Sequence, residues 1–308
     1  MLNKIMVSGR KLEISTAHYP PQSAFVYLVL EACGRLIHAS EPFYQLTGYS
    51  PSEIAAQPLL RVPSENDVPS LSTAINRAKE RNDNWQGELP QLTKKGEIIW
   101  LDVRLTAQRD EKGEIFAFVV WGVDITRHIA LRERLHFRAH NDVLTRILNR
   151  QGYYIRSRKK IRSAQAIGAK TVVAVLDLDK FKSINDRLGH AAGDEVLRCF
   201  VNRVKQSISH DTVFGRLGGD EFALTYVKGV DDGPEKEVLQ AIVEKMHIPV
   251  YLRQHQEIVH LSVSIGAAIY PEHGRHFSTV LKAADDALYI AKRRGGNSIS
   301  HYQVRHLI

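Results

Sequence analysis

The fold is decided by the stretch Gly215-Arg216-Leu217-Gly218-Gly219-Asp220-Glu221-Phe222-Ala223-Leu224. Adjacent glycines, then adjacent carboxylates and alternating apolar residues, indicate a tight turn that feeds a β-strand. The apolar residues just before the turn complete a hairpin. Because glycine lets the backbone approach a ligand closely, the acids at the tip could reach a hard cation. An ordinary solvated hairpin is the alternative that this stretch alone leaves open.

A second acidic position follows residues 172–176, whose continuous apolar character is typical of a buried strand. Asp177 stands at the end of that run, so its carboxylate would meet the hairpin acids if the two strands were neighbours. Magnesium binds one or two carboxylates together with substrate phosphates. Two such ions about 4 Å apart can stabilise the attacking and leaving oxygens of a phosphoryl transfer. The pattern therefore favours a metal-assisted reaction on a phosphorylated substrate.

The residues after Asp177 carry groups suited to a nucleotide. A turn that follows a strand offers backbone N–H groups and lysines, here Lys180 and Lys182, to a polyphosphate. Asn185 and Asp194 provide the donor and acceptor groups that match a guanine edge. Both residues could instead cap helices, which the residues alone leave open.

Length and composition limit the class of protein. The 308 residues are enough for two domains, and 44% hydrophobic with 25% charged residues is typical of a soluble chain. No apolar run approaches the roughly 18–20 residues that cross a bilayer, and the N-terminus lacks an apolar stretch of signal-peptide length. Cys33 and Cys199 lie far apart, which argues against a disulfide framework or a zinc site. We therefore expect a cytoplasmic protein without a membrane span.

The formal net charge of +8 suits an anionic ligand but is spread along the chain. The densest basic run is Arg156-Ser157-Arg158-Lys159-Lys160-Ile161-Arg162. We interpret it as the solvated face of a helix rather than as a nucleic-acid patch, and no nucleic-acid partner is expected.

The first half of the chain is interpreted as an arm followed by a small domain. Residues 1–21 show little hydrophobic pattern and form the arm, and the domain covers residues 22–127. Strands are predicted at residues 25–30, 36–39, 98–106 and 115–123, and a helix start at 50–53. Apolar residues at helical spacing then predict a linker helix over residues 125–140, with a plain surface helix as the alternative.

The second half, residues 141–308, is interpreted as an α/β domain, so the fold class of the chain is mixed, α/β (α+β). Strands are predicted at 172–176, on both sides of the hairpin turn and at 261–269, and helices at 197–208 and 277–293. Strands and helices that alternate in this way build a sheet covered by helices.

Several segments of this second half resemble the GGDEF diguanylate cyclases in order and spacing. They are Asp142-Val143-Leu144-Thr145, Asp177-Leu178-Asp179-Lys180-Phe181-Lys182, Gly193-Asp194, Gly218-Gly219-Asp220-Glu221-Phe222, Val263-Ser264-Ile265-Gly266 and Asp286-Ala287-Leu288-Tyr289. The resemblance implies the nucleotidyl cyclase catalytic fold. It also implies condensation of two GTP into cyclic di-GMP and two pyrophosphates across a homodimer, with two magnesium or manganese ions per active site.

The resemblance further implies a role for individual residues. Asp177, Asp220 and Glu221, with the Leu178 carbonyl, would bind the metals, and Asp220 or Glu221 would help to deprotonate the attacking 3′-hydroxyl. Gly218 and Gly219 would form the motif turn. The implied substrate-binding residues are Phe181, Lys182 and Lys292 for the phosphates, and Asn185, His190 and Asp194 around the guanine base. A packing or turn residue is the alternative for His190, and a solvated helix lysine for Lys292.

Two departures from the family pattern matter. Gly296 stands where members often carry an arginine, so Arg293 or Arg294 would have to supply that contact to the triphosphate. The inhibitory Arg-x-x-Asp pattern is absent from residues 208–212. Inhibition by product at that site is therefore not expected.

Residues 22–127 resemble a PAS sensor domain, an antiparallel sheet with flanking helices. The segments that carry the resemblance are Gly34-Arg35-Leu36-Ile37, Leu46-Thr47-Gly48-Tyr49, Trp85-Gln86-Gly87-Glu88-Leu89, Lys94-Lys95-Gly96-Glu97 and Asp124-Ile125-Thr126. Trp85 and residues 57–61 are similar to the FAD-binding redox subgroup, with core packing as the alternative for Trp85. His38 is a lone candidate for haem and is more typical of a strand residue.

The sequence thus predicts a PAS–GGDEF diguanylate cyclase, in which the sensor changes how two catalytic domains face each other. One rival is a catalytically silent regulator that binds GTP or cyclic di-GMP, and another is a pure interaction module. Because the sequence ends at Ile308, no phosphodiesterase domain is expected to follow.

Overall fold

The structure is a computed structural model that describes residues 2–15, 25–55, 70–80, 84–228, 236–252 and 255–303. The chain divides into two compact units, Met1–Glu133 and Arg134–Ile308. Within the described residues, none of the helices is long and apolar enough to cross a membrane.

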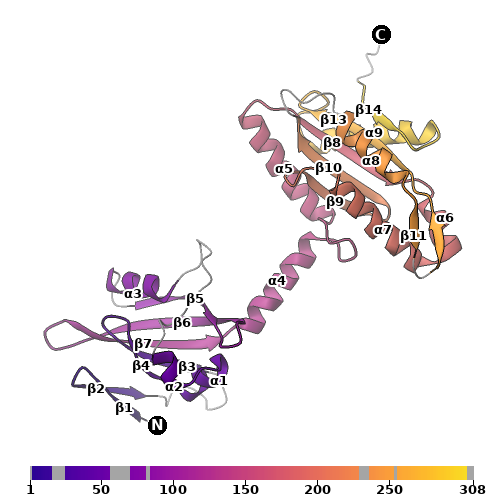
Figure 1. Ribbon diagram of the computed structural model, residues 1–308. Coiled ribbons are helices and arrows are strands. Elements are labelled where there is room, and N and C mark those ends of the chain that lie inside the picture. The colour runs from indigo at the N-terminus through magenta and orange to yellow at the C-terminus, as the bar shows by residue number, and fades with distance from the viewer. Residues whose placement is uncertain are drawn as a thin grey trace. The chain divides into compact units, whose positions relative to one another are not determined.

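The N-terminal unit is built on a five-stranded antiparallel sheet with the strand order β4-β3-β7-β6-β5 (Figure 1). One face of this sheet packs against α1, α2 and α3 around the buried side chains of Phe43, Ile54 and Leu71. The elements are β1 (Leu2–Val7), β2 (Arg10–Ser15), β3 (Phe25–Glu31), β4 (Leu36–Ala39), α1 (Glu41–Thr47), α2 (Pro51–Ala55), α3 (Leu71–Glu80), β5 (Asn84–Leu92), β6 (Ile98–Arg109) and β7 (Ile115–Asp124). The expected antiparallel sheet with flanking helices is confirmed.

The expectation of a patternless arm at residues 1–21 is wrong for its first part. β1 and β2 pair as an antiparallel hairpin. Val7 and Leu12 are buried in a cluster with Tyr27, Val29 and Val119, on the sheet face opposite the helices. Val7, Leu12 and the partly buried Ile5 do not make a clear sequence pattern in two short strands, yet they cover this face. Residues 16–21 lie outside the described part of the chain.

α4 (Thr126–His140) is the helix predicted at residues 125–140. Asp124 accepts hydrogen bonds from the backbone N–H and the hydroxyl of Thr126 at 2.8 and 2.5 Å, which begins the helix. Ile129 is the buried residue of α4, whereas Leu131 and Leu135 are 54% and 58% exposed. The helix therefore has an apolar stripe that the described residues leave largely exposed.

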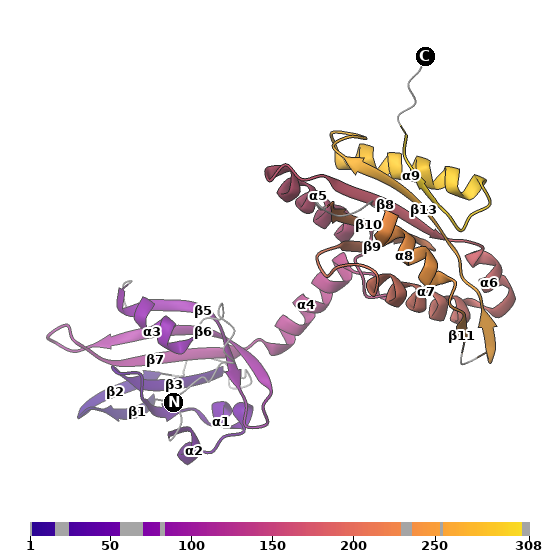
Figure 2. The same ribbon diagram turned by 45° about the horizontal axis from the view of Figure 1, so that its top comes forward.

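The C-terminal unit is a five-stranded sheet with the order β14-β13-β8-β10-β9. Figure 2 shows α9 and α7 on opposite sides of it. The elements are α5 (Arg150–Ala166), β8 (Thr171–Leu178), α6 (Phe181–Leu188), α7 (His190–Lys205), β9 (Val213–Gly218), β10 (Glu221–Val227), α8 (Lys236–Met246), β11 (Val250–Leu252), β12 (Glu257–Val259), β13 (Val263–Tyr270), α9 (Phe277–Arg293) and β14 (Ile299–His301).

The central strand explains why this unit has two hydrophobic layers. Every residue of β8 is buried, so its alternate side chains serve both faces of the sheet. Val172, Ala174 and Leu176 pack with α7 and α8. Val173 and Val175 pack with α5 and α9. The continuous apolar run predicted such a strand, and its burial on both faces holds its C-terminal end in a fixed place.

Candidate functional site

The two acidic positions predicted from the sequence meet at one end of the sheet. β8 and β10 pair antiparallel, and Glu221 is the register partner of Asp177. The Leu178 N–H donates to the Asp220 carbonyl at 3.4 Å. The hairpin turn contains Gly219 at φ +50°, in the left-handed region that glycine adopts readily. A Cβ added at Gly218 or Gly219 would have no neighbour within 4 Å, so the space above the turn is open.

The electrostatics at this end suit a cation. The Asp177 carboxylate is 9% exposed and forms an ion pair with the Lys292 ammonium at 2.6 Å. Burial raises the pKa of the Asp177 carboxyl, Lys292 opposes that rise, and the charges of Asp220 and Glu221 add to it. Added positive charge would therefore favour the ionised form of Asp177.

The carboxylates do not form a complete metal cage by themselves. Among the described residues, no group of three or more His, Cys, Asp or Glu side chains could hold an ion. Asp177 instead contacts Lys292, and neighbouring carboxylates repel one another. Magnesium takes one or two carboxylates and completes its shell with water and substrate phosphates. Asp177 with an acid of the hairpin fits that kind of site.

Asn185 and Asp194 are brought together where α6 packs on α7. The Asn185 Oδ1 atom is buried and has no hydrogen-bond partner. A Cβ on Gly193 would stand 1.9 Å from that atom, so only glycine leaves room for the amide there. Asp194 follows Gly193 directly on α7, and His190 is exposed in the first turn. The Asn185 Oδ1 atom is therefore free to accept a hydrogen bond from water or from a ligand.

The predicted phosphate contacts divide into two kinds. The Phe181 side chain is 8% exposed and packs in the core, so only its backbone can face a phosphate. Lys182 is exposed on the first turn of α6, where unpaired N–H groups favour anions. Lys292 reaches the site from α9 and contacts Asp177. Both lysines can therefore offer charge to a polyphosphate.

Asp179 is a residue of this site to which the sequence interpretation gave no role. Its carboxylate accepts hydrogen bonds from the Ser262 hydroxyl at 2.8 Å, the Ser264 hydroxyl at 2.6 Å and the Asn297 N–H at 2.8 Å. These donors come from the start of β13 and from the loop after α9. Asp179 thus ties the end of β8 to the segment that follows Lys292. In the sequence, its position two residues after Asp177 is the feature that could have indicated a role at this site.

Gly296 lies close against the Asp179 carboxylate, where only glycine leaves enough room. Its φ is +76°, and an added Cβ would lie 2.9 Å from the Asp179 carboxylate. Any side chain at this position, including the arginine common in the family, would strain the loop in its present conformation.

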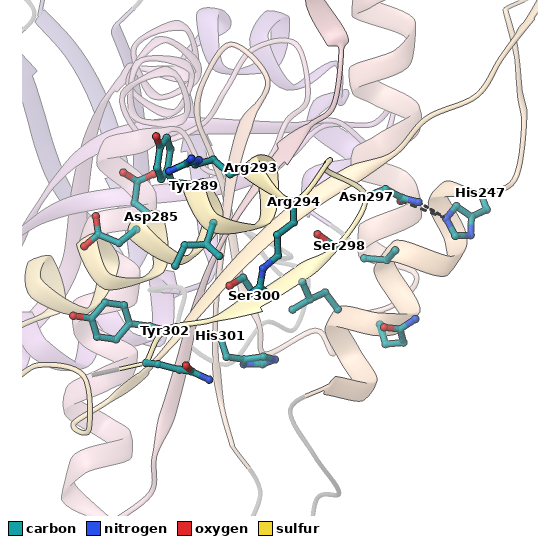
Figure 3. A pocket seen from close by; sticks show the side chains of 16 residues that line it. His247, Asp285, Tyr289, Arg293, Arg294, Asn297, Ser298, Ser300, His301 and Tyr302 are labelled. Carbon is teal, nitrogen blue, oxygen red and sulfur yellow. Dashed lines mark hydrogen bonds between the residues drawn. The ribbon is translucent and has the colours of Figure 1, made fainter. Parts of the chain in front are cut away.

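The expectation that Arg293 or Arg294 replaces that arginine is not supported by their placement. Both line a groove of about 1610 Å³ between α8 and α9 at the β14 edge, and neither Asp177 nor Lys292 lines it. In Figure 3, Arg294 lies beside Ser300 and Arg293 against Tyr289, with its guanidinium 5.9 Å from the ring centroid. In this structure Lys292 is the residue of this segment that contacts the acidic site.

A second set of hydrogen bonds, centred on Arg216, fixes the hairpin turn. The Arg216 Nε donates to the Gly219 carbonyl at 2.8 Å, and its Nη1 lies 3.2 Å from the Asp142 carboxylate. Asp142 also accepts from the Thr145 N–H at 2.8 Å. Asn149 caps α5 and donates to the Ala139 carbonyl of α4 at 3.0 Å. Hydrogen bonds therefore connect the end of α4, the start of α5 and the hairpin.

The segment that would carry an inhibitory Arg-x-x-Asp has another structure. Ser209 and Thr212 share a hydroxyl hydrogen bond of 3.2 Å, and Asp211 pairs with Lys160 of α5. These contacts form a closed turn whose only acidic side chain already has a cationic partner.

In the N-terminal unit, Trp85 packs on the core cluster and its ring lies against Gly87, where an added Cβ would be 2.7 Å away. Residues 57–61, the rest of the FAD expectation, lie outside the described residues. The structure thus gives Trp85 a packing role. His38 is a strand residue of β4 whose ring contacts the Tyr27 hydroxyl at 3.1 Å.

Comparison with known proteins identifies both units. The family described as "Diguanylate cyclase, GGDEF domain" matches residues 139–298, more than half of the chain. The chain belongs to the GGDEF diguanylate cyclase family. A PAS fold family matches residues 36–120. Magnesium generally supports catalysis in GGDEF domains, and GGDEF cyclases bind GTP and cyclic di-GMP.

The relatives of this GGDEF protein include both synthetic and degrading enzymes. Diguanylate cyclase TpbB of Pseudomonas aeruginosa (strain UCBPP-PA14) is 37% identical over 164 residues, 53% of this chain and 38% of TpbB. Cyclic di-GMP phosphodiesterase PdeR of Escherichia coli (strain K12) is 30% identical over 284 residues, 92% of this chain and 41% of PdeR. The chain thus spans about two fifths of the length of these curated relatives.

Among solved structures, the coiled coil and GGDEF domain of DgcB from Caulobacter crescentus, in complex with c-di-GMP, has a TM-score of 0.52 at 27% identity. The match covers 57% of this chain and 93% of the DgcB chain. The likeness supports the fold assigned to the C-terminal unit.

Proposed function

We propose that this protein is a diguanylate cyclase that condenses two GTP into cyclic di-GMP and two pyrophosphates. The observation that carries the proposal is the register pairing of Asp177 with Glu221 across β8 and β10, together with the ion pair between Asp177 and Lys292. The buried Oδ1 atom of Asn185 on α6, which has no hydrogen-bond partner among the described residues, supports it. Acidic and cationic groups are thus grouped at one end of one sheet. An ordinary solvated hairpin would not explain why these groups lie together.

In the proposed reaction, the 3′-oxygen of each GTP attacks the α-phosphorus of the other. A new P–O bond forms, the bond from the α-phosphorus to the bridging oxygen breaks, and pyrophosphate leaves with that electron pair. Asp220 or Glu221 accepts the proton of the 3′-hydroxyl. Asp177, Asp220, Glu221 and the Leu178 carbonyl are the proposed ligands of two Mg²⁺ or Mn²⁺ ions per site, which would neutralise charge at the phosphates.

The remaining residues position the substrate. Asn185 and Asp194 bind the guanine edge beside His190, because an amide and a carboxylate complement its donors and acceptors. Lys182, Lys292 and the backbone at Phe181 hold the triphosphate. Most of the rate enhancement then comes from orientation and electrostatics.

The reaction requires two catalytic units, so the active form is a homodimer. Leu131 and Leu135 lie four residues apart on α4 and are largely exposed, which suits pairing with a second copy of this helix. A change in the PAS unit would reach the catalytic hairpin through α4 and the contacts of Asn149, Asp142 and Arg216. Regulation by the sensor would act on this path.

Metal-dependent GTP binding separates this enzyme from its rivals. We expect the parent protein to bind GTP more tightly with Mg²⁺ than without it, and Asp177→Asn to lose that difference. A silent regulator would bind GTP in the same way but release no pyrophosphate. An interaction module would bind no GTP under either condition, and that result would contradict the proposal.

A further inference from the structure

The basic run of α5 meets a second basic segment at the end of the sheet remote from Asp177. A pocket of about 340 Å³ is lined there by Arg158 and Arg162 of α5 and by Arg275 from the loop before α9. Its floor is apolar, because Ile161, Tyr270 and Phe277, which also line it, are each 5–7% exposed. No described Asp or Glu side chain belongs to the lining.

The charges of this pocket are uncompensated. Arg158 and Arg162 are four residues apart on one helix face, a spacing at which like charges destabilise a helix. Within the described part of the chain, none of the three arginines forms an ion pair, whereas Lys160 of the same run pairs with Asp211. An arrangement that repels itself when empty becomes favourable when an anion binds.

The chemistry of the pocket favours phosphate on a small organic body. Guanidinium groups bind phosphate oxygens through planar, paired N–H donors, better than other cations do. A rim of three such groups above an apolar and aromatic floor would hold the phosphate at the mouth and the rest of the ligand against Tyr270 and Phe277. The volume suits a single small molecule rather than a macromolecular surface.

The pocket is separate from the catalytic site. Tyr270 is the register partner of Thr171 at the start of β8, whereas Asp177 stands near the end of the same strand. Six residues of extended strand span about 20 Å. A ligand of mononucleotide size therefore cannot occupy both places.

We propose that this pocket binds a small phosphate-bearing molecule of nucleotide size, with Arg158, Arg162 and Arg275 on its phosphate oxygens. Pyrophosphate, GTP and cyclic di-GMP all carry the required chemistry. They serve as separate probes, because pyrophosphate reports the phosphate contact alone and the nucleotides add a base.

The test measures binding of each probe to the full chain by calorimetry in metal-free buffer, at low and high salt. At least one probe binds the parent, and Arg158→Gln and Arg275→Gln each weaken its binding about tenfold, the loss expected for a charged hydrogen bond. High salt weakens binding in the same direction. Arg156→Gln, an exposed arginine of α5 outside the pocket, is the matched control and retains the parent affinity.

Two outcomes would overturn the proposal. Either no probe binds the parent, or both pocket variants bind the probes as well as Arg156→Gln does. The second outcome would assign the measured binding to the catalytic site. Because the assay needs neither metal nor turnover, its result is independent of whether the protein makes cyclic di-GMP.

Discussion

At the scale of single residues, the buried position of the Asp177 carboxylate lowers the stability of the folded protein. Burial raises the pKa of its carboxyl, so the fold disfavours the ionised form. The acids of the hairpin add to that cost, and Lys292 offsets only part of it. An unfavourable buried charge of this kind is expected where the function of a protein requires it.

We therefore predict that Asp177→Asn melts at the same temperature as the parent or higher in metal-free buffer at neutral pH, because it removes a buried charge. Its rate of cyclic di-GMP formation falls at least about 100-fold, since a proposed metal ligand is lost. Thermal unfolding and product analysis check both parts. The control is Asp211→Asn, whose carboxylate is exposed, pairs with Lys160 and has a lowered pKa, so neutralising it brings no gain. A marked loss of stability in Asp177→Asn would contradict the account.

Asp179 gives a second prediction at this scale. Asp179→Ala leaves three donors without their shared acceptor, which is expected to cost about 1–3 kcal/mol in the free energy of unfolding. The loop after α9 then loosens, and the KM for GTP rises roughly tenfold with a smaller change in kcat, because Lys292 is no longer held. Ser262→Ala removes one of the three donors and should show a smaller effect of the same kind. Equal KM values for Asp179→Ala and the parent would refute this positioning role.

The sequence predicted which residues belong to the site better than it predicted which of them contact one another. The sequence predicted that Asp177 would meet the hairpin acids if their two strands were neighbours, and β8 and β10 are neighbours in the sheet. The roles of Asp179 and Gly296 depend on a contact between segments more than a hundred residues apart, which no local pattern contains. Likewise, Arg293 and Arg294 follow Lys292 directly, yet at the end of α9 they turn away from the acidic site and line another groove.

At the scale of elements, α4 packs little of its apolar surface against the described part of the chain. Ile129 is buried and Arg132 pairs with Glu88, but Leu131 and Leu135 are exposed. An amphipathic helix of this length is stable mainly when its apolar stripe is covered.

We predict that replacing both leucines by aspartate shifts the protein from dimer to monomer in analytical ultracentrifugation and lowers the rate of cyclic di-GMP formation at least tenfold. GTP binding by the catalytic unit should persist, because neither leucine belongs to the proposed GTP site. Arg134→Ala, an exposed change on the same helix, should leave the dimer intact. A doubly substituted protein that remains dimeric would assign the dimer contact to another surface.

Element boundaries were predicted well where the apolar period is strong. α9 begins and ends at the predicted residues 277 and 293, since buried alanines and leucines recur along its whole length. α7 was predicted from residue 197 but begins at His190, because its first turns carry Gly193 and Asp194 in place of large apolar residues. Those turns carry His190 and Asp194, which are proposed to bind guanine, so the local pattern is weakest where the substrate is proposed to bind.

At the scale of the whole molecule, two units of different chemistry are joined by one helix. The N-terminal sheet is covered on both faces, by helices and by the β1–β2 hairpin. The C-terminal sheet keeps one end open above Gly218 and Gly219. An open end at the acidic hairpin leaves room for the proposed nucleotide substrate.

The central claim is that this chain makes cyclic di-GMP with the acids of its hairpin. The most direct measurement is nucleotide analysis by mass spectrometry after the purified protein is incubated with GTP and Mg²⁺, beside Asp220→Ala. The account predicts cyclic di-GMP and pyrophosphate from the parent and neither from the variant. Equal amounts of cyclic di-GMP from both proteins would contradict the role of the hairpin, and no product with no GTP binding would contradict the catalytic function itself.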